Sequence, residues 1–347
     1  MSDIHMKSLG VIILAAGVGK RMKSNLLKVL HPICGRPMLS YIIDTAVGLS
    51  PEKIVIVSSP KMEEEILRFA QNDRWGRNDK EFKSSKVQWN KIEFVIQDPP
   101  RGTGDAVMCA ESIFSDFDGP ILVLCGDVPL LKSDTLNNLI KFHNTNKGAA
   151  TVLTTIVPDP ASYGRVVKSK IKNQKSKVKK IVEATDASES IKRIDEINTG
   201  IYIFDKSLLF DTLHKIKPSN VQGEYYLTDT IEILCNEDKE VYGFLTNDWQ
   251  EVIGINTRKT LADVESMLQA QIIEHHQLNG VAIKNHTTID FGVKIGSDTI
   301  IHSGAFLLGN TQVGENCEIG ANTAVEDSII SSGTIIGANS DIRNAKL

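Results

Sequence analysis

The sequence predicts an α/β domain built on a mixed β-sheet, followed by a short parallel β-helix. Short apolar runs at 11–14, 53–59 and 121–124 alternate with helical patterns and end in small or acidic residues, which is typical of parallel strands in an open α/β sheet. From residue 150 onward the apolar runs become longer and favour antiparallel strands. Towards the C-terminus aliphatic residues recur at every sixth position, which is the period of a β-helix.

Length and composition restrict the class of protein. A chain of 347 residues is long enough for two domains, and 24% charged residues with a formal net charge of −4 argue against bulk binding to nucleic acids or anionic membranes. No apolar run has the length of a signal peptide or a membrane span, so we expect a cytoplasmic protein. The cysteines are scattered without a C-x-x-C pair, which favours reduced thiols over disulfides or a zinc site: Cys34, Cys109, Cys125, Cys235 and Cys317.

The segment 11–38 joins a buried strand to a loop of small residues and cations. After the strand comes AAGVG (15–19), where backbone N–H groups can approach a ligand closely. Lys20, Arg21 and Lys28 follow this loop. Exposed amides and converging cations suit a polyphosphate, so this segment is the first candidate binding site.

Two commoner phosphate-binding motifs are excluded in this segment. A Walker A motif would need Gly at Leu14 and Ser or Thr at Arg21, and a dinucleotide fingerprint would need its third Gly at Met22. The alternative, which involves no ligand, is an ordinary strand–loop–helix unit with cations on its surface.

The next elements continue the alternation of strands and helices. Apolar residues at helical spacing predict a helix after Pro37, and strands are expected at 53–59 and 92–97. The polar run 72–88 between these strands is predicted to be a surface insertion, because the acidic balance favours a solvated loop over a nucleic-acid contact there.

A Pro- and Gly-rich loop follows the second of these strands. The run QDPPRGTGDA (97–106) requires a tight turn, and Ala106 is expected to begin a helix. The Gln97 amide offers a donor and an acceptor side by side, which suits the edge of a pyrimidine. The alternative is a strand-to-helix turn capped by Thr103 or Asp105.

The run ILVLCGDVPLL (121–131) places a carboxylate at the end of a core strand. Asp127 follows Gly126 at the carboxyl end of this strand, where open α/β sheets bind ligands. The position suits one hard oxygen ligand to a Mg²⁺ ion that also holds substrate phosphates. The alternative is a cap for a helix near Ser133, but Pro129 lies between them.

Four longer strands and a solvated loop are expected in the second half of the α/β domain. The strands are predicted at 150–157, 163–169, 180–188 and 197–204. The lysine-rich run 168–180 is interpreted as a solvated hairpin loop.

A further core strand is expected at 251–256, ending on Asn256. A helix is expected at 258–278, with one apolar face made by Leu261, Val264, Leu268, Ile272 and Ile273.

The hexapeptide repeat predicts the β-helix. Aliphatic residues fall at intervals of six, one residue then drops out, and the rhythm resumes: Ile283, Ile289, Ile295, Ile301, Leu307, Val313, Ile319 and Val325, then Ile330, Ile336 and Ile342. Glycine directly follows several of them, as at Gly296, Gly314, Gly320 and Gly337. Each aliphatic side chain is expected to point inward and to stack on the coil below.

Taken together these motifs resemble the sugar nucleotidyltransferase family. The string LAAG-x-G-x-R-M followed by K-x-L and G-R-P-M, the Gln97 loop and the G-D-x-P-L string carry the resemblance. It implies a Rossmann-like nucleotidyltransferase domain with a mixed sheet, followed by a short left-handed parallel β-helix. Within it, the match is nearest to the bifunctional bacterial N-acetylglucosamine-1-phosphate uridylyltransferases/glucosamine-1-phosphate acetyltransferases, and it runs from about residue 11 to residue 347. The chain departs from the family at Lys20, Leu27 and Cys125, which removes no phosphate or metal contact.

The resemblance implies a role for each candidate residue. Arg21 and Lys28 would be the catalytic cations, and Asp127 and Asn256 would hold Mg²⁺. The implied nucleotide-binding residues are Leu14, Ala15, Ala16, Gly17, Gln97, Gly102, Thr103, Cys125 and Gly126. The implied sugar-binding residues are Gly164, Glu183, Asn198, Tyr226, Thr228 and Asn256.

The resemblance also implies a reaction and an organisation. The reaction is Mg²⁺-dependent uridylyl transfer from UTP to N-acetylglucosamine 1-phosphate, giving UDP-N-acetylglucosamine and pyrophosphate. We expect a nucleotidyltransferase domain at 1–257, a linker helix at 258–279 and a β-helix at 280–347 that associates as a homotrimer. Because the family's acetyltransferase residues lie on later coils, that activity is expected to be absent.

Three alternatives stay open. The first is an enzyme of the same fold that uses another sugar 1-phosphate or another nucleoside triphosphate. The second is a catalytically silent regulatory or assembly subunit, against which the intact set of cations and metal ligands argues. The third and least favoured is a stand-alone acyltransferase that uses His286 and His302 of the β-helix.

Overall fold

The computed structural model describes residues 8–17, 19–61, 65, 92–160, 162–169 and 177–347. The chain divides into two compact units, each of which draws on two stretches of sequence. One unit contains Met1–Val29 and Leu39–Gly254, and the other contains Leu30–Met38 and Ile255–Leu347. The insertion expected at 72–88 and the middle of the lysine-rich run 168–180 lie outside the described residues.

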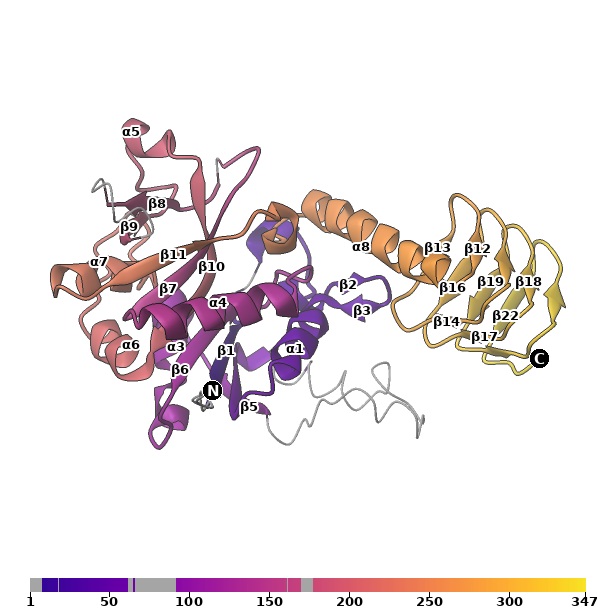
Figure 1. Cartoon of the computed structure of the whole chain (residues 1–347), viewed down its shortest axis with the longest axis horizontal. Helices are drawn as coiled ribbons and strands as arrows, with labels where there is room; N and C mark the ends of the chain where they lie inside the picture. Colours follow the sequence, from indigo (N-terminus) through magenta and orange to yellow (C-terminus); the bar gives the residue numbers. More distant parts are fainter. Residues whose placement is uncertain (1–7, 18, 62–64, 66–91, 161, 170–176) are drawn as a thin grey trace. The chain divides into compact units, whose positions relative to one another are not determined.

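The first unit is built on a nine-stranded mixed sheet, as the sequence predicted (Figure 1). Seven strands follow the order β11-β7-β10-β6-β1-β4-β5, and β8 joins through β10 with β9 beside it. β1 is parallel to β4 and β6, whereas β10 is antiparallel to β6 and β7. The bounds are β1 Gly10–Leu14, β4 Lys53–Ser58, β5 Ile92–Ile96, β6 Pro120–Cys125, β7 Ala150–Ile156, β8 Arg165–Lys168, β9 Val178–Val182, β10 Glu196–Asp205 and β11 Val241–Leu245.

Helices cover the sheet because its central strands are apolar on both faces. Val11, Ile12 and Ile13 of β1 are all fully buried, as expected of a parallel strand between two helical layers. Side chains of α3, α6 and α7 share one core cluster with strand residues such as Val123. The helices are α1 Met38–Gly48, α3 Thr103–Met108, α4 Ser133–Asn146, α5 Glu189–Lys192, α6 Lys206–Leu213 and α7 Asp229–Asn236.

One strand prediction was wrong. Residues 251–256 form no strand; a 3₁₀ helix, η6 (Trp249–Val252), lies there, and the missed strand is β11. The Glu251 carboxylate is only 2% exposed and accepts hydrogen bonds from the hydroxyls of Thr135 and Thr246, each at 2.8 Å. The 3₁₀ helix places this buried carboxylate within reach of its hydrogen-bond donors. A hydrophobic pattern alone does not reveal such an arrangement.

Two element boundaries also differ from the sequence predictions. The strand expected at 180–188 ends at Val182, and the helix expected from Ala106 begins at Thr103. The residues left out of the strand are available to the site described below.

The second unit begins with a long helix and a hairpin from early in the sequence. α8 (Arg258–Leu278) confirms the predicted helix, and the hairpin consists of β2 (Pro32–Ile33) and β3 (Arg36–Pro37). The Cys34 N–H donates to Glu265 Oε1 at 3.1 Å, and the Phe291 N–H donates to the Cys34 carbonyl at 3.0 Å. The hairpin therefore packs on α8 and on the first coils of the β-helix.

The rest of this unit is the predicted parallel β-helix. Its short strands stack in three sheets, with partners eighteen residues apart in most pairs, such as Ile301 and Ile319. The dropped residue shortens the spacing to seventeen in the last three pairs, the first of which joins Gln312 to Ile329. The strands are β12 Ala282–Ile283, β13 Thr288–Ile289, β14 Lys294–Ile295, β15 Ile300–Ile301, β16 Phe306–Leu308, β17 Gln312–Val313, β18 Glu318–Ile319, β19 Ala324–Glu326, β20 Ile329–Ile330, β21 Ile335–Ile336 and β22 Asp341–Arg343.

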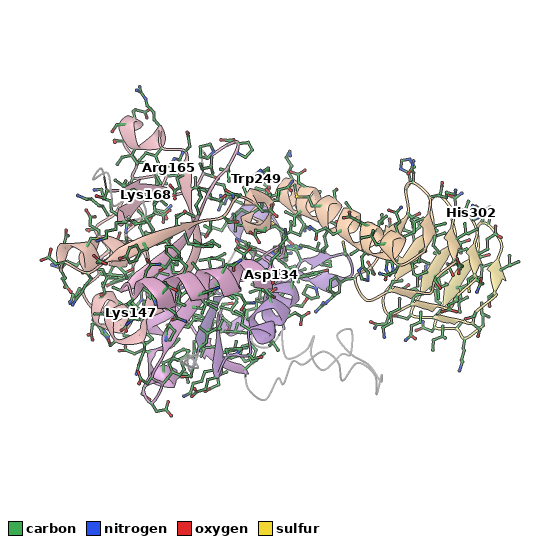
Figure 2. All side chains as sticks on the ribbon, in the orientation of Figure 1. Asp134, Lys147, Arg165, Lys168, Trp249 and His302 are labelled. Carbon is green, nitrogen blue, oxygen red and sulfur yellow. The ribbon has the colours of Figure 1, made fainter. Side chains whose placement is uncertain are left out.

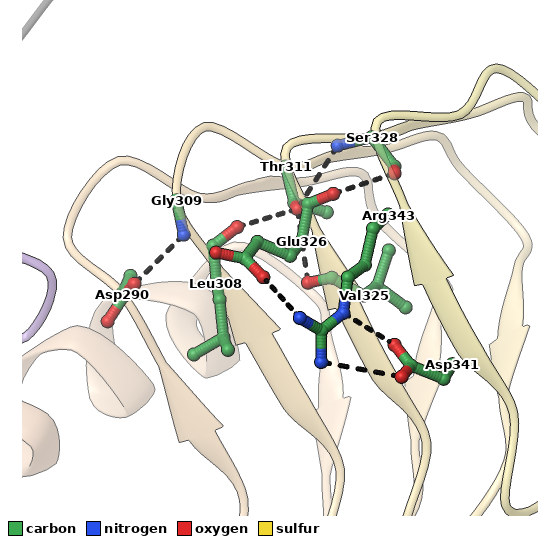
Figure 3. A network of polar contacts seen from close by, with 9 residues as sticks. All are labelled: Asp290, Leu308, Gly309, Thr311, Val325, Glu326, Ser328, Asp341 and Arg343. Carbon is green, nitrogen blue, oxygen red and sulfur yellow. Dashed lines mark hydrogen bonds and ion pairs between the residues drawn. The ribbon is translucent and has the colours of Figure 1, made fainter. Parts of the chain in front are cut away.

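A second interior ladder, which the sequence analysis missed, consists mostly of small residues two positions before the aliphatic residues, such as Thr311 before Val313. The Thr311 hydroxyl is buried and donates to the Leu308 carbonyl at 2.7 Å, while the Ser328 hydroxyl donates to the Glu326 carbonyl at 2.8 Å (Figure 3). These hydroxyls satisfy carbonyls at the corners of the coils. On the outer surface Arg343 is paired with Glu326, with 3.6 Å between nitrogen and oxygen (Figure 3).

Candidate active site

The small-residue loop begins where two parallel strands end. The Gly126 N–H donates to the Leu14 carbonyl at 2.9 Å, and the Ala15 N–H donates to the Val57 carbonyl at 2.9 Å. Ala15 and Ala16 are buried, and Gly17 is exposed. The predicted phosphate-binding loop and the strand that leads to Asp127, the predicted metal ligand, therefore meet at the carboxyl edge of the sheet.

Close packing of Gly19 brings Lys28, the predicted catalytic lysine, back to this edge. Gly19 has φ +64°, and a Cβ on it would lie 2.6 Å from the Cβ of Lys28. Only glycine combines this left-handed conformation with so close an approach. Arg21 lies on η1 (Lys20–Met22) between them and is exposed to solvent.

Lys28 and Asp127 form the central ion pair of the site. The Lys28 ammonium is paired with Asp127 Oδ2, and the two side chains are 13% and 17% exposed. A partly buried pair is screened less by solvent than a surface pair, so it orients both groups. The structure thus brings together the Lys28 ammonium and the Asp127 carboxylate, which lie far apart in the sequence.

Tyr163 belongs to this cluster although the sequence analysis gave it no role. Its hydroxyl is hydrogen-bonded to the backbone of Gly254, and the pKa of the phenol is raised by burial, with a smaller contribution from the charge of Asp127. The available signal was its place directly before Gly164, a predicted sugar-binding residue. Tyr163 therefore lies near Asp127 and directly before Gly164 in the chain.

The Gln97 amide is fixed by the loop that follows it. Gln97 is 4% exposed, and its Nε2 donates to the Gly102 carbonyl at 2.9 Å and to Asp105 Oδ2 at 2.7 Å. Asp105 is also buried and is paired with Arg101 at 2.8 Å. Asp105 therefore sets the orientation of the amide, a role that the sequence analysis missed because it considered this residue only as a possible helix cap.

The Gly-Thr-Gly loop is attached to the segment that precedes α7. The Gly104 N–H donates to the Tyr225 carbonyl at 2.7 Å, and the Leu227 N–H donates to Thr103 Oγ1 at 3.0 Å. Gly102 has φ +113°, and a Cβ there would lie 2.5 Å from the Tyr225 carbonyl oxygen. The Thr103 hydroxyl thus holds the loop against the segment of Tyr226 and Thr228.

Four of the predicted sugar-binding residues come together. The Asn198 N–H donates to the Gly164 carbonyl at 2.9 Å, and a Cβ on Gly164 would lie 3.2 Å from Glu183 Oε2. Thr228 Oγ1 donates to Glu183 Oε1 at 3.2 Å. Burial raises the pKa of Glu183, and the Thr228 hydrogen bond partly offsets that rise. Tyr226 is also buried, on the same segment as Thr228.

A β-bulge in β10 connects this sugar cluster to the strand of Asp127. The pairing of β10 with β7 shifts register between Asn198 and Tyr202, and Gly200 in the bulge has φ +79°. Cys125 Sγ contacts the Gly200 carbonyl oxygen at 3.3 Å. Burial raises the pKa of the Cys125 thiol to about 12, so the sulfur is a thiol rather than a thiolate.

The donor set suits a hard cation. Among the described residues no group of three or more His, Cys, Asp or Glu side chains could hold a metal ion by itself. Asp127 supplies a half-buried carboxylate, and the protonated Cys125 thiol contacts a carbonyl instead. A Mg²⁺ ion that takes most of its ligands from phosphates and water fits such a site, whereas a soft metal would not. Asn256, the other predicted ligand, is half-buried and belongs to the second unit.

One cavity of the first unit is separate from this cluster. A cavity of about 810 Å³ lies near the opposite edge of the sheet, beside the first residue of β6 and the last of β10, with Pro120, His143 and Asp205 in its lining. Arg165 and Lys168 lie on β8 (Figure 2). Across the described residues no helix is long and apolar enough to cross a membrane.

Fold and site define a nucleotidyltransferase. The nucleotidyl transferase family model matches residues 10–260, and the bacterial transferase hexapeptide model matches residues 292–327. A solved structure of UDP-glucose pyrophosphorylase complexed with UDP-glucose is similar, with a TM-score of 0.57, 18% identity, and coverage of 77% of this chain and 99% of that chain. That likeness confirms the fold of the catalytic unit.

Comparison with sequence relatives identifies the family more closely. The bifunctional protein GlmU of Listeria innocua is 38% identical over 341 residues, which are 97% of this chain and 68% of the relative. That of Alkaliphilus oremlandii is 40% identical over 338 residues, 97% of this chain and 69% of the relative. The chain belongs to the GlmU family of nucleotidyltransferases, and it spans about two thirds of the length of these relatives.

Proposed function

We propose that the protein transfers a uridylyl group from UTP to N-acetylglucosamine 1-phosphate, releasing pyrophosphate. The observation that carries the proposal is the Lys28–Asp127 pair, which lies beside the small-residue loop at the carboxyl ends of β1 and β6. A site of this kind can align two phosphorylated substrates in one place.

The chemistry requires alignment and charge neutralisation. A phosphate oxygen of the sugar phosphate attacks the α-phosphorus of UTP in line, and the bond to the bridging oxygen of the β-phosphate breaks, so that pyrophosphate leaves. Lys28 stabilises negative charge on the α-phosphate and the incoming sugar phosphate. The exposed Arg21 would neutralise the leaving pyrophosphate.

Mg²⁺ is part of the proposal. Asp127 would hold it, and when bound it supplies positive charge that holds the phosphates in place. Lys28, already paired with Asp127, keeps the carboxylate in position before the substrates arrive.

The Gln97 loop supports uridine as the base. Both Nε2 protons of Gln97 are used within the loop, so its carbonyl oxygen is the atom that can accept a hydrogen bond from the base. Uracil carries a proton on N3 whereas cytosine carries a lone pair there, so an acceptor favours uracil. The half-buried Glu183 and the buried Asn198 suit the hydroxyls and the acetamido group of the sugar.

We also propose that the protein acts as a homotrimer held by the β-helix. Its outer faces carry large apolar side chains, including Ile300 at 38% exposure and Ile335 at 75%. These residues lie on the same sheet, that of β12, β15, β18 and β21, and could be covered by a second copy of the chain.

The test is pyrophosphate release by the purified protein with Mg²⁺ and a panel of substrates. Each of UTP, CTP, ATP and GTP is paired with N-acetylglucosamine, glucosamine, glucose or mannose 1-phosphate. Release confined to UTP with the N-acetylated sugar is the expected result. Preference for another pair would contradict the proposed substrates but not the proposed mechanism. If folded protein releases no pyrophosphate with any pair, the proposed enzymatic activity is wrong.

A further inference from the structure

The carboxylate of Asp186 has no role in the reaction described above, yet it joins two segments beside the sugar cluster. The Asp186 N–H donates to the Glu183 carbonyl at 3.0 Å, which closes the turn 183–186. Asp186 Oδ1 accepts the Val221 N–H at 3.1 Å, and Oδ2 accepts the Thr185 hydroxyl at 3.0 Å. Asp186 therefore connects the turn of Glu183 to a loop that lies 35 residues later in the chain.

The loop that Asp186 contacts is itself a closed turn. Asn220 Oδ1 accepts the Glu224 N–H at 3.1 Å, and Asn220 Nδ2 donates to the Glu224 carbonyl at 2.5 Å. Gly223 has φ +66°, and its N–H donates to the Asn220 carbonyl at 3.0 Å. The Val221 side chain is 77% exposed, so hydrogen bonds rather than packing set the position of this residue. The turn 220–224 thus presents the Val221 N–H to Asp186.

The far end of this turn is attached to the Gly-Thr-Gly loop. The Tyr225 N–H donates to the Arg101 carbonyl at 2.8 Å, and the Tyr225 carbonyl accepts the Gly104 N–H at 2.7 Å. The same segment continues to Thr228, whose Oγ1 donates to Glu183 Oε1 at 3.2 Å. Glu183 therefore meets a segment whose position is set by the loop that is proposed to read the base.

We propose that Asp186 is a positioning residue for sugar recognition, which ties the turn of Glu183 to the turn 220–224 and so holds the Glu183 carboxylate ready to accept a sugar hydroxyl. This inference rests on the proposed function and names a residue that sets the affinity for the sugar phosphate but not for the nucleotide. A binding group that is ordered before its ligand arrives costs less entropy on binding. The Gly-Thr-Gly loop keeps its own contacts with Tyr225, so loss of Asp186 loosens the sugar side of the site alone.

The decisive variants are Asp186→Ala and Asp186→Asn. Alanine removes the acceptor of the Val221 N–H, whereas asparagine keeps an acceptor oxygen and loses the charge. We expect the KM for N-acetylglucosamine 1-phosphate to rise roughly 3- to 10-fold in Asp186→Ala and by less than about twofold in Asp186→Asn. In both variants kcat and the KM for UTP should change little. Asp211→Ala, on the exposed side of α6, is the matched control and should leave all three constants unchanged.

Asn220→Ala distinguishes positioning from direct contact between Asp186 and the sugar. It opens the turn 220–224 and leaves the Asp186 side chain in place, so a positioning role predicts a similar rise in the KM for the sugar phosphate. The double variant should cost little more than either single variant, because both changes break the same connection.

Five outcomes would each overturn the inference. They are an unchanged KM for the sugar phosphate in Asp186→Ala, an unchanged KM in Asn220→Ala, additive effects in the double variant, an equal rise in the KM for UTP, and a rise in Asp186→Asn as large as in Asp186→Ala.

The substrate panel on the wild-type protein tests the proposed function separately. If the wild type prefers another sugar 1-phosphate, the proposed substrate is wrong, and the same variants are compared by their KM for that sugar phosphate. If no pair reacts, calorimetric titration with UDP-N-acetylglucosamine replaces the kinetics. Weaker binding by Asp186→Ala than by the wild type and Asp186→Asn then supports the positioning role, and equal binding or no binding by all three refutes it.

Discussion

Asp127 is the residue on which the proposed chemistry depends most. Replacing it by Asn keeps the shape but removes the charge that orients Lys28 and attracts a cation. We expect kcat to fall by roughly 10²–10³, by analogy with the loss of one group that stabilises transition-state charge. Steady-state kinetics of pyrophosphate release measures this effect.

Asp134→Asn provides the control for this change. Asp134 lies exposed in the first turn of α4 (Figure 2), so the same chemical change there should leave kcat within about twofold. An Asp127→Asn protein with near-normal turnover over a range of Mg²⁺ concentrations would exclude the assigned role.

His143 makes stability depend on pH in the acid range. Burial lowers the pKa of this histidine from 6.5 to about 4, and its Nδ1 lies 3.0 Å from the Thr151 hydroxyl. Between these two pH values the unfolded chain binds more protons than the folded one, so the stabilising contribution is complete above pH 6.5 and is lost as the pH falls towards 4. From pH 7 to pH 5 we expect a loss of roughly 2 kcal/mol from this residue.

Thermal unfolding at both pH values checks this prediction. His143→Asn should show a smaller fall in Tm between pH 7 and pH 5 than the wild type, whatever its absolute stability. The exposed His214 is the control, and His214→Asn should leave the fall unchanged. An equal fall in the wild type and in His143→Asn would show that another group controls acid stability.

The individual site residues were partly predictable. Lys28, Asp127, Glu183 and Asn198 stand in motifs that resemble those of the family, and this resemblance selected them as candidates. Asp105 was missed because it acts on another side chain, that of Gln97, through a contact made only in the folded chain. Sequence patterns report local preference and do not reveal such supporting contacts.

The hexapeptide coil is the element whose rules are clearest. Glycine follows the inward aliphatic residue because the next coil passes directly over it. A Cβ on Gly320 would lie 2.4 Å from the backbone nitrogen of Ala338. Gly337, at the equivalent position one coil later, has nothing within 4 Å of such a Cβ. Equivalent positions in sequence therefore differ in packing.

This difference makes a matched pair of variants. Gly320→Ala should destabilise the β-helix by about 1–3 kcal/mol, because the backbone of the next coil must move to admit the methyl group. Gly337→Ala should be neutral or slightly stabilising, since it lowers the entropy of the unfolded chain. Chemical denaturation of the two variants measures both effects, and equal stability of the two would contradict the packing argument.

Elements were predicted well where one interaction dominates. Apolar runs were sufficient for β1, β4, β5 and β6, and the strict period was sufficient for the β-helix. The segment 251–256 was misread because its apolar residues fit a strand, while the backbone is set by hydrogen bonds to the Glu251 carboxylate from α4 and from the residue after β11. Only the assembled fold supplies those donors.

At the scale of the whole molecule the proposed trimer gives a direct prediction. Light scattering coupled to size exclusion should find three times the chain mass of 38.2 kDa. Ile335→Lys places a charge on the outward position of β21, where the side chain is 75% exposed, and should shift the mass towards that of one chain. A wild-type mass of one chain would refute the trimer.

The hairpin at Leu30–Met38 has a consequence for how this protein could be divided. It belongs to the same unit as α8 and the β-helix, although the sequence places it between the phosphate loop and α1. The chain therefore passes between the units three times, and a single cut before Ile255 would leave the hairpin without the Glu265 and Phe291 partners of Cys34. Recombination at one crossover point would split the second unit, so the catalytic unit and the β-helix cannot be exchanged among relatives as simple modules. Any chimaera must take the hairpin and the β-helix from the same parent.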